Sequence, residues 1–184
     1  MPQPPTSADI TIARYIDAKD QNRPHLMTQA FEDDAVLTMQ VESSEIAFPA
    51  QVNGRQAITQ TLVRDFAARF ENIYTYCLTK PTSQTMTDCQ LNWLVVMTER
   101  DSGNTKLGYG RYDWHFNPAS GRCSTLHIHI AHMQVLSESI AQQIYQHISD
   151  YPTPWQSAGA LQSLLQANDA LASAHGFLTD AARC

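Results

Sequence analysis

The spacing of apolar residues divides the chain into helical and strand-like segments. Apolar residues recur every three or four positions in the helical segments, as Ile12, Tyr15 and Ile16 do, because this spacing places them on one helix face. In the strand-like segments apolar and polar residues alternate, which is typical of a strand with one buried face. The predicted helices cover residues 8–20, 24–31, 55–70, 138–149 and 157–174, and the predicted strands cover 35–42, 72–80, 87–100, 106–117 and 122–136, with a loop over 43–54.

The order of these segments predicts an α+β fold. Turn-forming residues at 101–104 and at Asn117-Pro118 connect the last three strands and predict an antiparallel meander. Because long strands twist and curve, helices gathered on one face have to cover this sheet. We expect residues 1–136 to form this unit and residues 137–184 to add a helical C-terminal extension packed on it, since its regularly spaced leucines need a surface to bury against.

Two glycines interrupt one predicted strand. The string Gly108-Tyr109-Gly110 lies within residues 106–117 and is not followed by a turn and a helix, so it is not a dinucleotide-binding motif. Glycines inside a strand mark a bend or a close approach of neighbouring atoms.

Composition and charge narrow the class of protein. The 184 residues carry 12 Lys and Arg against 18 Asp and Glu, a net charge of -6, which argues against a nucleic-acid-binding surface. Apolar runs are too short to span a membrane, and charged residues interrupt the N-terminal segment, so we expect neither a membrane span nor a signal peptide. Cys77, Cys89, Cys123 and Cys184 form no Cys-x-x-Cys pair, and we expect free thiols in a cytoplasmic protein without a cofactor.

Three short strings and one turn, taken in order, resemble the nuclear transport factor 2-like superfamily, in particular its SnoaL-like members. The strings are Arg14-Tyr15-Ile16, residues 30–36 (AFEDDAV) and residues 54–58 (GRQAI), and the turn is Phe116-Asn117. The resemblance covers residues 8–136 and implies a cone, in which a curved antiparallel or mixed sheet wraps around the N-terminal helices and leaves an apolar pocket at its wide end. Members include ketosteroid isomerase, scytalone dehydratase, polyketide cyclases, dioxygenase β-subunits and many non-enzymes, so the fold alone leaves function open.

The residues at the family's catalytic positions argue against the isomerase mechanism. Isomerase-like members use a tyrosine on the first helix, a base on the first strand and a protonated acid in the meander. The resemblance places Tyr15 on the tyrosine, Met39 on the base and Tyr112 on the acid. Both tyrosines can donate hydrogen bonds, but a methionine cannot take a proton, so the mechanism lacks its base.

The dehydratase and cyclase patterns leave one acidic candidate. Scytalone dehydratase-like members carry an aspartate on the first helix, which the resemblance places on Asp17, and a histidine at a position that falls near Thr75 or Tyr76. That histidine is missing. Polyketide cyclase-like members need an acid or base in an apolar pocket, and Asp17 is again the candidate. Alternatively, Asp17 has no catalytic role and is a solvated helix residue beside the apolar face of the helix. The same alternative applies to Asp20, one turn later.

Histidines gather near the end of the meander. Strand periodicity places Arg111, Asp113, His115, His127 and His129 on one face of the sheet. Several imidazoles and a carboxylate on one face could bind a transition metal such as zinc. The polar face of a cone should instead point outward, so we expect no metal and a homodimer formed through this convex face.

These observations lead to one preferred interpretation and two alternatives. We expect a protein of unknown specific activity whose pocket takes a small apolar or aromatic ligand. The first alternative is an isomerase, cyclase or dehydratase acting on a polyketide- or steroid-like carbonyl compound, in which Tyr15 polarises the carbonyl and Asp17 moves the proton. The second is a structural or accessory subunit resembling a dioxygenase β-subunit. The expected pocket residues are Met39, Phe66, Trp93, Tyr112, Trp114 and Ile128.

Overall fold

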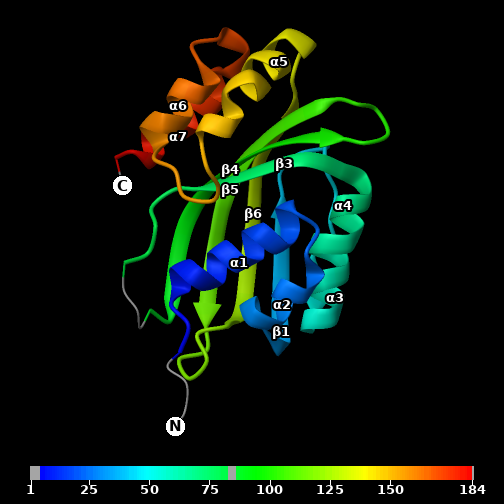
Figure 1. Ribbon diagram of the computed structural model, residues 1–184, viewed down its shortest axis with the longest axis vertical. Coiled ribbons are helices and arrows are strands. Elements are labelled where there is room, and N and C mark those ends of the chain that lie inside the picture. The colour runs from blue at the N-terminus through cyan, green and yellow to red at the C-terminus, as the bar shows by residue number, and fades with distance from the viewer. Residues whose placement is uncertain (1–4, 83–85, 184) are drawn as a thin grey trace.

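The computed structural model describes residues 5–82 and 86–183 and shows a curved six-stranded sheet with helices packed against it (Figure 1). The strand order is β2-β1-β6-β5-β4-β3, in which β1 and β6 run parallel and the other neighbours run antiparallel. The predicted α+β fold with a curved mixed sheet is therefore confirmed. The main elements are α1 (Ala8–Asp20), α2 (Met27–Ala30), β1 (Phe31–Val41), β2 (Gln51–Asn53), α3 (Arg55–Thr59), α4 (Asp65–Arg69), β3 (Phe70–Cys77), β4 (Asp88–Glu99), β5 (Thr105–Phe116), β6 (Cys123–Val135), α5 (Glu138–His147), α6 (Ala158–Leu165) and α7 (Ala172–Ala181).

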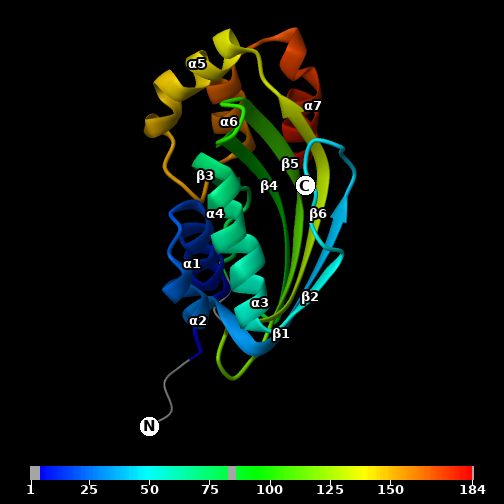
Figure 2. The ribbon, with the colours of Figure 1, turned by 90° about the vertical axis from the view of Figure 1, so that its right-hand side faces the viewer.

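Helices α1 to α4 cover the concave face of the sheet (Figure 2). Alternate strand residues point toward these helices because side chains alternate across a strand. In β5 these residues are Tyr112, Trp114 and Phe116, and all three are buried. Helix α1 places Ile12 and Tyr15 in the same hydrophobic cluster. The larger core of the protein therefore lies between α1–α4 and the concave face.

The C-terminal helices α5, α6 and α7 pack on the opposite, convex face, toward one end of β3, β4 and β5 (Figure 2). The strand residues that they cover alternate with the concave ones, and Leu94, Val96, Leu107 and Tyr109 are all buried there. Leucines and isoleucines of the three helices complete this second hydrophobic cluster. The sheet is thus covered by apolar side chains on both faces in this part of the molecule.

The loop between α5 and α6 covers the free edge of β3. Trp155 forms a parallel bridge with Cys77, whose backbone N–H donates to the Pro154 carbonyl. The Cys77 carbonyl in turn accepts a hydrogen bond of 3.1 Å from the Gln156 N–H. Because an uncovered strand edge can pair with other chains, these contacts protect the Cys77 end of this edge.

Two boundaries near the N-terminus differ from the sequence-based predictions. Residues 31–34, predicted to end a helix, begin β1, because Phe31 is fully buried and pairs with Cys123 of β6. The predicted loop over 43–54 contains β2, an edge strand of three residues that is too short to show an alternating pattern.

Two predicted helices have breaks or irregular turns. The helix predicted over 157–174 is two helices, because Gln166 has a positive φ of 54° and Asn168 caps the following turn by accepting a hydrogen bond from the Ala170 N–H. The helix predicted over 55–70 is continuous, but residues Gln60–Arg64 form a π-helical turn between α3 and α4.

Three of the four cysteines lie in the described part of the chain. Cys77 and Cys123 are buried, Cys89 is half-buried, and none of the three forms a disulfide. Burial raises the pKa of the Cys77 and Cys123 thiols well above the usual value, which keeps both protonated and unreactive. Cys184 lies outside the described residues. Among the helices in residues 5–82 and 86–183, none has the length and apolar character needed to cross a membrane.

Gly110 allows β5, β6 and a tryptophan to approach closely. A Cβ atom at this position would collide with the backbone carbonyl of His129 and with the Trp93 ring. The approach coincides with a bulge in the β5–β6 pairing between Tyr109 and Gly110. The glycine therefore relieves crowding, as its place inside a strand predicts.

We expect Gly110→Ala to lower the free energy of unfolding by about 1–3 kcal/mol, because backbone atoms cannot move away as a flexible side chain would. Gly159→Ala is the matched control. Gly159 lies in the first turn of α6 with no atom close to the added methyl group, so this change should stabilise the protein by about 0.5–1 kcal/mol. Urea denaturation of both variants checks the pair, and equal stabilities would contradict the crowding argument.

Candidate functional site

A narrow cavity lies between α1, the α3–α4 helix and the concave face of the sheet. Its volume is about 40 Å³, enough for a few water molecules but less than the roughly 150 Å³ of a cavity that binds benzene. The lining is mostly apolar or aromatic, and three of its residues are methionines. The residues that line it are Tyr15, Lys19, Met39, Ile46, Phe48, Leu62, Phe66, Thr75, Trp93, Val95, Met97, Tyr112, Ile128, Ile130 and Met133.

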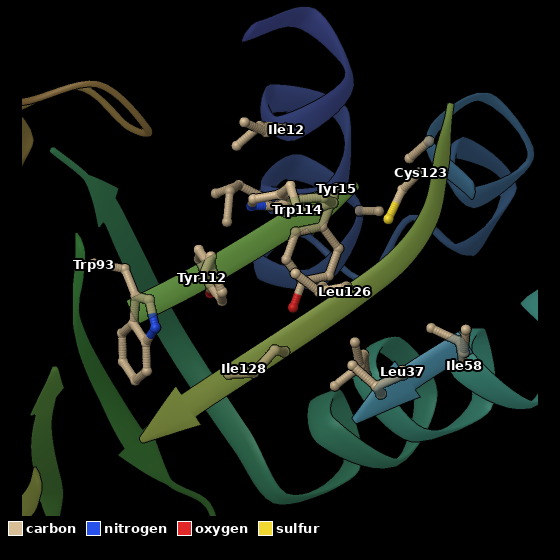
Figure 3. Packing of buried hydrophobic residues seen from close by; sticks show 14 of the residues in the cluster. Ile12, Tyr15, Leu37, Ile58, Trp93, Tyr112, Trp114, Cys123, Leu126 and Ile128 are labelled. Atoms are coloured by element: carbon tan, nitrogen blue, oxygen red, sulfur yellow. The ribbon is translucent and has the colours of Figure 1, made fainter. Parts of the chain in front are cut away.

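Most of the predicted pocket residues meet at this cavity. Met39, Phe66, Trp93, Tyr112 and Ile128 line it, together with Tyr15 from α1; Figure 3 shows four of these six side chains on their elements. They come together because alternate positions of β1, β4, β5 and β6 face the same helix.

Trp114 is the predicted pocket residue that does not line the cavity. Its ring packs edge-on against Tyr15, 5.4 Å between centroids, and stacks on Phe116 at 5.8 Å. It faces inward as predicted, but it lies at the next inward-facing position of β5 after Tyr112 and is enclosed by other rings.

The predicted proton carrier, Asp17, lies outside the cavity. Its side chain is 41% exposed and forms an ion pair of 3.1 Å with Arg23 at the surface. Tyr15 and Asp17, the residues expected to polarise a carbonyl and to move a proton, therefore do not meet at one site in this structure.

Lys19, Asp20 and Thr75 instead form a buried polar cluster beside the cavity. The Lys19 ammonium donates to Asp20 Oδ1 at 2.6 Å and to Thr75 Oγ1 at 2.7 Å. Asp20 accepts two more hydrogen bonds from Thr75, one from its backbone N–H to Oδ2 at 2.7 Å and one from its hydroxyl to Oδ1 at 2.9 Å. The side chains of Lys19 and Asp20 are 7% and 3% exposed, so a complete ion pair is enclosed at the edge of an apolar space.

The face of the lysine directed at the cavity is covered by an aromatic ring. The Lys19 Nζ lies 4.9 Å from the centroid of Phe66, a distance at which a cation is attracted to the ring face. Lys19 and Thr75 are the lining residues that carry this polarity into the cavity.

Tyr15 and Tyr112 supply two further hydroxyl groups. Both rings are buried and lie edge-on to each other, 6.1 Å between centroids. Burial raises the pKa of both phenols far above the usual value of 10. Both groups therefore stay protonated and act as hydrogen-bond donors rather than as bases.

The indole nitrogen of Trp93 is a donor without an acceptor. Its Nε1 is buried and has no hydrogen-bond partner among the described residues. The Trp93 ring stacks on the ring of Tyr112, with 5.5 Å between centroids, and both residues line the cavity. A buried N–H without a partner loses its hydration without compensation.

The segment between β1 and β2 covers the cavity. Ile46 and Phe48 of this segment both line it, and the Phe48 ring stacks on Phe66 with 6.3 Å between centroids. Lys106, which is 5% exposed, holds the segment by donating to the Glu45 carbonyl at 2.8 Å. We call residues 43–49 the cover segment.

The polar residues predicted on the convex face lie beside the area that α5–α7 cover. We call this group, which consists of Arg111, Asp113, His115, His127 and His129, the polar strip. Its side chains have partners of their own, which are Asp88 for His115, Thr38 for His127, Glu42 for His129 and Asp113 for Arg111. Among the residues that the structure describes, no three His, Cys, Asp or Glu side chains converge as metal ligands would.

No protein-family model matches the chain, and no curated protein matches its sequence. Solved structures do match. A superfamily protein of the nuclear transport factor 2-like (NTF2-like) kind from Salmonella enterica serovar Typhimurium has a TM-score of 0.53 and 19% identity, over 65% of this chain and 85% of that one. The chain has the NTF2-like fold.

Two further structures with this fold are of a dehydrochlorinase and of a putative isomerase. A type 2 hexachlorocyclohexane dehydrochlorinase, LinA, has a TM-score of 0.56 and 11% identity, over 70% of this chain and 85% of that one. A putative isomerase from Rhodopseudomonas palustris has a TM-score of 0.52 and 14% identity, over 66% of this chain and 86% of that one. At these identities the likeness concerns the fold alone.

Within this NTF2-like fold, sequence reasoning missed Lys19 and the role of Asp20, although one signal was present. Lys19 follows Ile12 by seven residues and Tyr15 by four, so helical spacing places it on the buried face. Lysine is rarely buried unless it is paired, so helical spacing alone does not predict a lysine in the core. Thr75 completes the cluster by accepting from Lys19 and donating to Asp20.

We expect Asp20→Asn to lower the free energy of unfolding by about 3 kcal/mol, because it leaves the buried Lys19 charge without its counter-ion. The control is Asp17→Asn, one helical turn away, which breaks an exposed pair and should change stability by less than about 0.5 kcal/mol. Guanidinium denaturation of both variants measures the difference. Similar small effects would mean that the Lys19–Asp20 pair is not buried as described.

Proposed function

We propose that the protein binds a small, largely apolar molecule in the cavity between α1 and the concave face of the sheet. The observation that carries this proposal is the lining, in which a predominantly apolar wall is combined with the donors of Lys19, Trp93 and the Tyr15–Tyr112 pair. Convergent polar groups in an apolar concave site are the usual composition of a ligand pocket.

Access and room depend on the cover segment. The cavity is too small for an aromatic ring as it stands, and the Phe48 ring occupies the space next to it. Met39, Met97 and Met133 line the remaining walls, and methionine side chains adapt readily to a new occupant. A ligand ring would therefore enter by displacing Phe48.

An enzyme is the second candidate function, because the similar structures include a dehydrochlorinase and a putative isomerase. Proton transfer needs a base that is free to act. Asp20 is the carboxylate next to the cavity, but both its oxygens already accept hydrogen bonds, and Met39 occupies the expected base position. Exchange of the acetophenone methyl protons in D₂O, catalysed by the wild type and lost in Tyr15→Phe, would favour the enzyme.

The homodimer through Arg111, Asp113, His115, His127 and His129 remains a proposal. The strip stays outside the area that the C-terminal helices cover, which supports it. Light scattering at micromolar concentration tests it.

We expect Phe48→Ala to bind toluene severalfold more tightly than the wild type, because it opens space beside Phe66 without removing a core residue. Phe177→Ala is the matched control, since this half-buried phenylalanine stacks on Tyr109 on the opposite face of the sheet. It should leave toluene binding unchanged. Titration followed by protein NMR gives both affinities, and no toluene binding in the wild type or in Phe48→Ala would contradict the proposed function.

A further inference from the structure

We propose that the ligand is a neutral carbonyl compound, such as a ketone, aldehyde or ester, and that Lys19 and Trp93 recognise its oxygen. This inference rests on the proposed binding function and names the chemical class of the ligand. It follows from the balance of donors and acceptors around the cavity and from the net charge of the buried cluster.

Lys19 has hydrogen-bonding capacity left over. An ammonium group has three N–H donors, and the hydrogen bonds that the structure shows go to Asp20 and Thr75. The remaining N–H is on a group that lines the cavity and is otherwise faced by the Phe66 ring. An acceptor atom of a ligand would satisfy it.

Trp93 supplies a second, independent donor. Its side chain is buried and lines the cavity, and its Nε1 has no partner in the described part of the chain. The hydroxyls of Tyr15 and Tyr112, which also line the cavity, can donate as well. The cavity is therefore rich in donors.

The carboxylate beside the cavity is already used, and Lys19 and Trp93 can only donate, whereas the tyrosine hydroxyls can donate or accept. The carboxylate of Asp20 accepts from Lys19 and from two groups of Thr75. A ligand whose polar group is a donor would find no comparable free acceptor there. The imbalance favours a ligand that presents an oxygen acceptor and no donor.

The charge balance distinguishes a neutral oxygen from a carboxylate. Lys19 and Asp20 neutralise each other, with 2.6 Å between Nζ and Oδ1 and both side chains almost fully buried. A ligand carboxylate would add an unbalanced negative charge to this apolar space, which is strongly unfavourable. A neutral carbonyl oxygen accepts the same hydrogen bonds without that charge.

Three probes with one heavy-atom skeleton test the inference: acetophenone, α-methylstyrene and benzoate. The first has a neutral carbonyl, the second replaces its oxygen by a CH₂ group, and the third carries a carboxylate. NMR titration of the wild type and of Phe48→Ala, which has more room, gives the dissociation constants. We expect acetophenone to bind roughly tenfold or more tightly than α-methylstyrene, as for about two hydrogen bonds, and benzoate to bind most weakly.

Two variants test whether Trp93 and Lys19 cause the preference for acetophenone over α-methylstyrene. Trp93→Phe should reduce the ratio of the two neutral affinities about threefold to tenfold, since one hydrogen bond is lost. Trp114→Phe is the matched control, because the Trp114 Nε1 is also buried without a partner in the described chain but does not line the cavity. The double variant Lys19→Met with Asp20→Asn removes the ammonium without leaving a lone buried charge, and should also reduce the ratio. The ratio is insensitive to a general loss of packing.

The outcomes separate the two proposals. Equal binding of acetophenone and α-methylstyrene, or benzoate binding as tightly as acetophenone, would overturn the inference while the binding function stands. An acetophenone preference that survives in Trp93→Phe and in the double variant would overturn the assignment to these donors. No binding of any probe, even by Phe48→Ala, would overturn the proposed function itself.

Discussion

A charged amine buried beside an apolar core has to find polar partners, and this requirement joins α1 to β3. Lys19 and Asp20 lie at the end of α1, and Thr75 lies in β3. Asp20 holds both the backbone and the hydroxyl of Thr75, so the helix is fixed against the strand in one register. The contacts that position α1 against β3 thus also form the polar end of the cavity. A change in the position of the helix would therefore change the polar end of the cavity as well.

The sheet itself is constrained from both sides. Its concave residues pack against α1–α4 and its convex residues, such as Leu94 and Tyr109, pack against α5–α7. A strand that is buried on both faces can neither slide by one residue nor flatten without exposing apolar surface. Gly110 permits the close approach of β5 and β6 at this point. The C-terminal helices therefore help to hold the curvature on which the cavity depends, although they contribute no lining residue.

Periodicity predicted the parts of the structure that local spacing controls. The alternation of β5 and β6 placed Tyr112 and Ile128 inward, and the helical spacing of α1 placed Tyr15 beside them. The boundaries that were wrong depend on distant partners: Phe31 is in a strand because Cys123 lies next to it. Asp17 and Asp20 have equal standing in the sequence, and only the position of Thr75, 55 residues further along, decides which of them is buried.

Met39 lines the cavity with a side chain that cannot take a proton, while Lys19 and Thr75 give the cavity polar character. The polar groups around the cavity are mainly hydrogen-bond donors, namely those of Lys19, Trp93 and the two tyrosines. The Thr75 hydroxyl donates its hydrogen bond to Asp20, so this carboxylate beside the cavity is satisfied and shielded. A site with unpaired donors, an occupied carboxylate and no net charge is suited to holding an oxygen atom in place rather than to moving a proton from carbon, and this physical asymmetry favours a binding role.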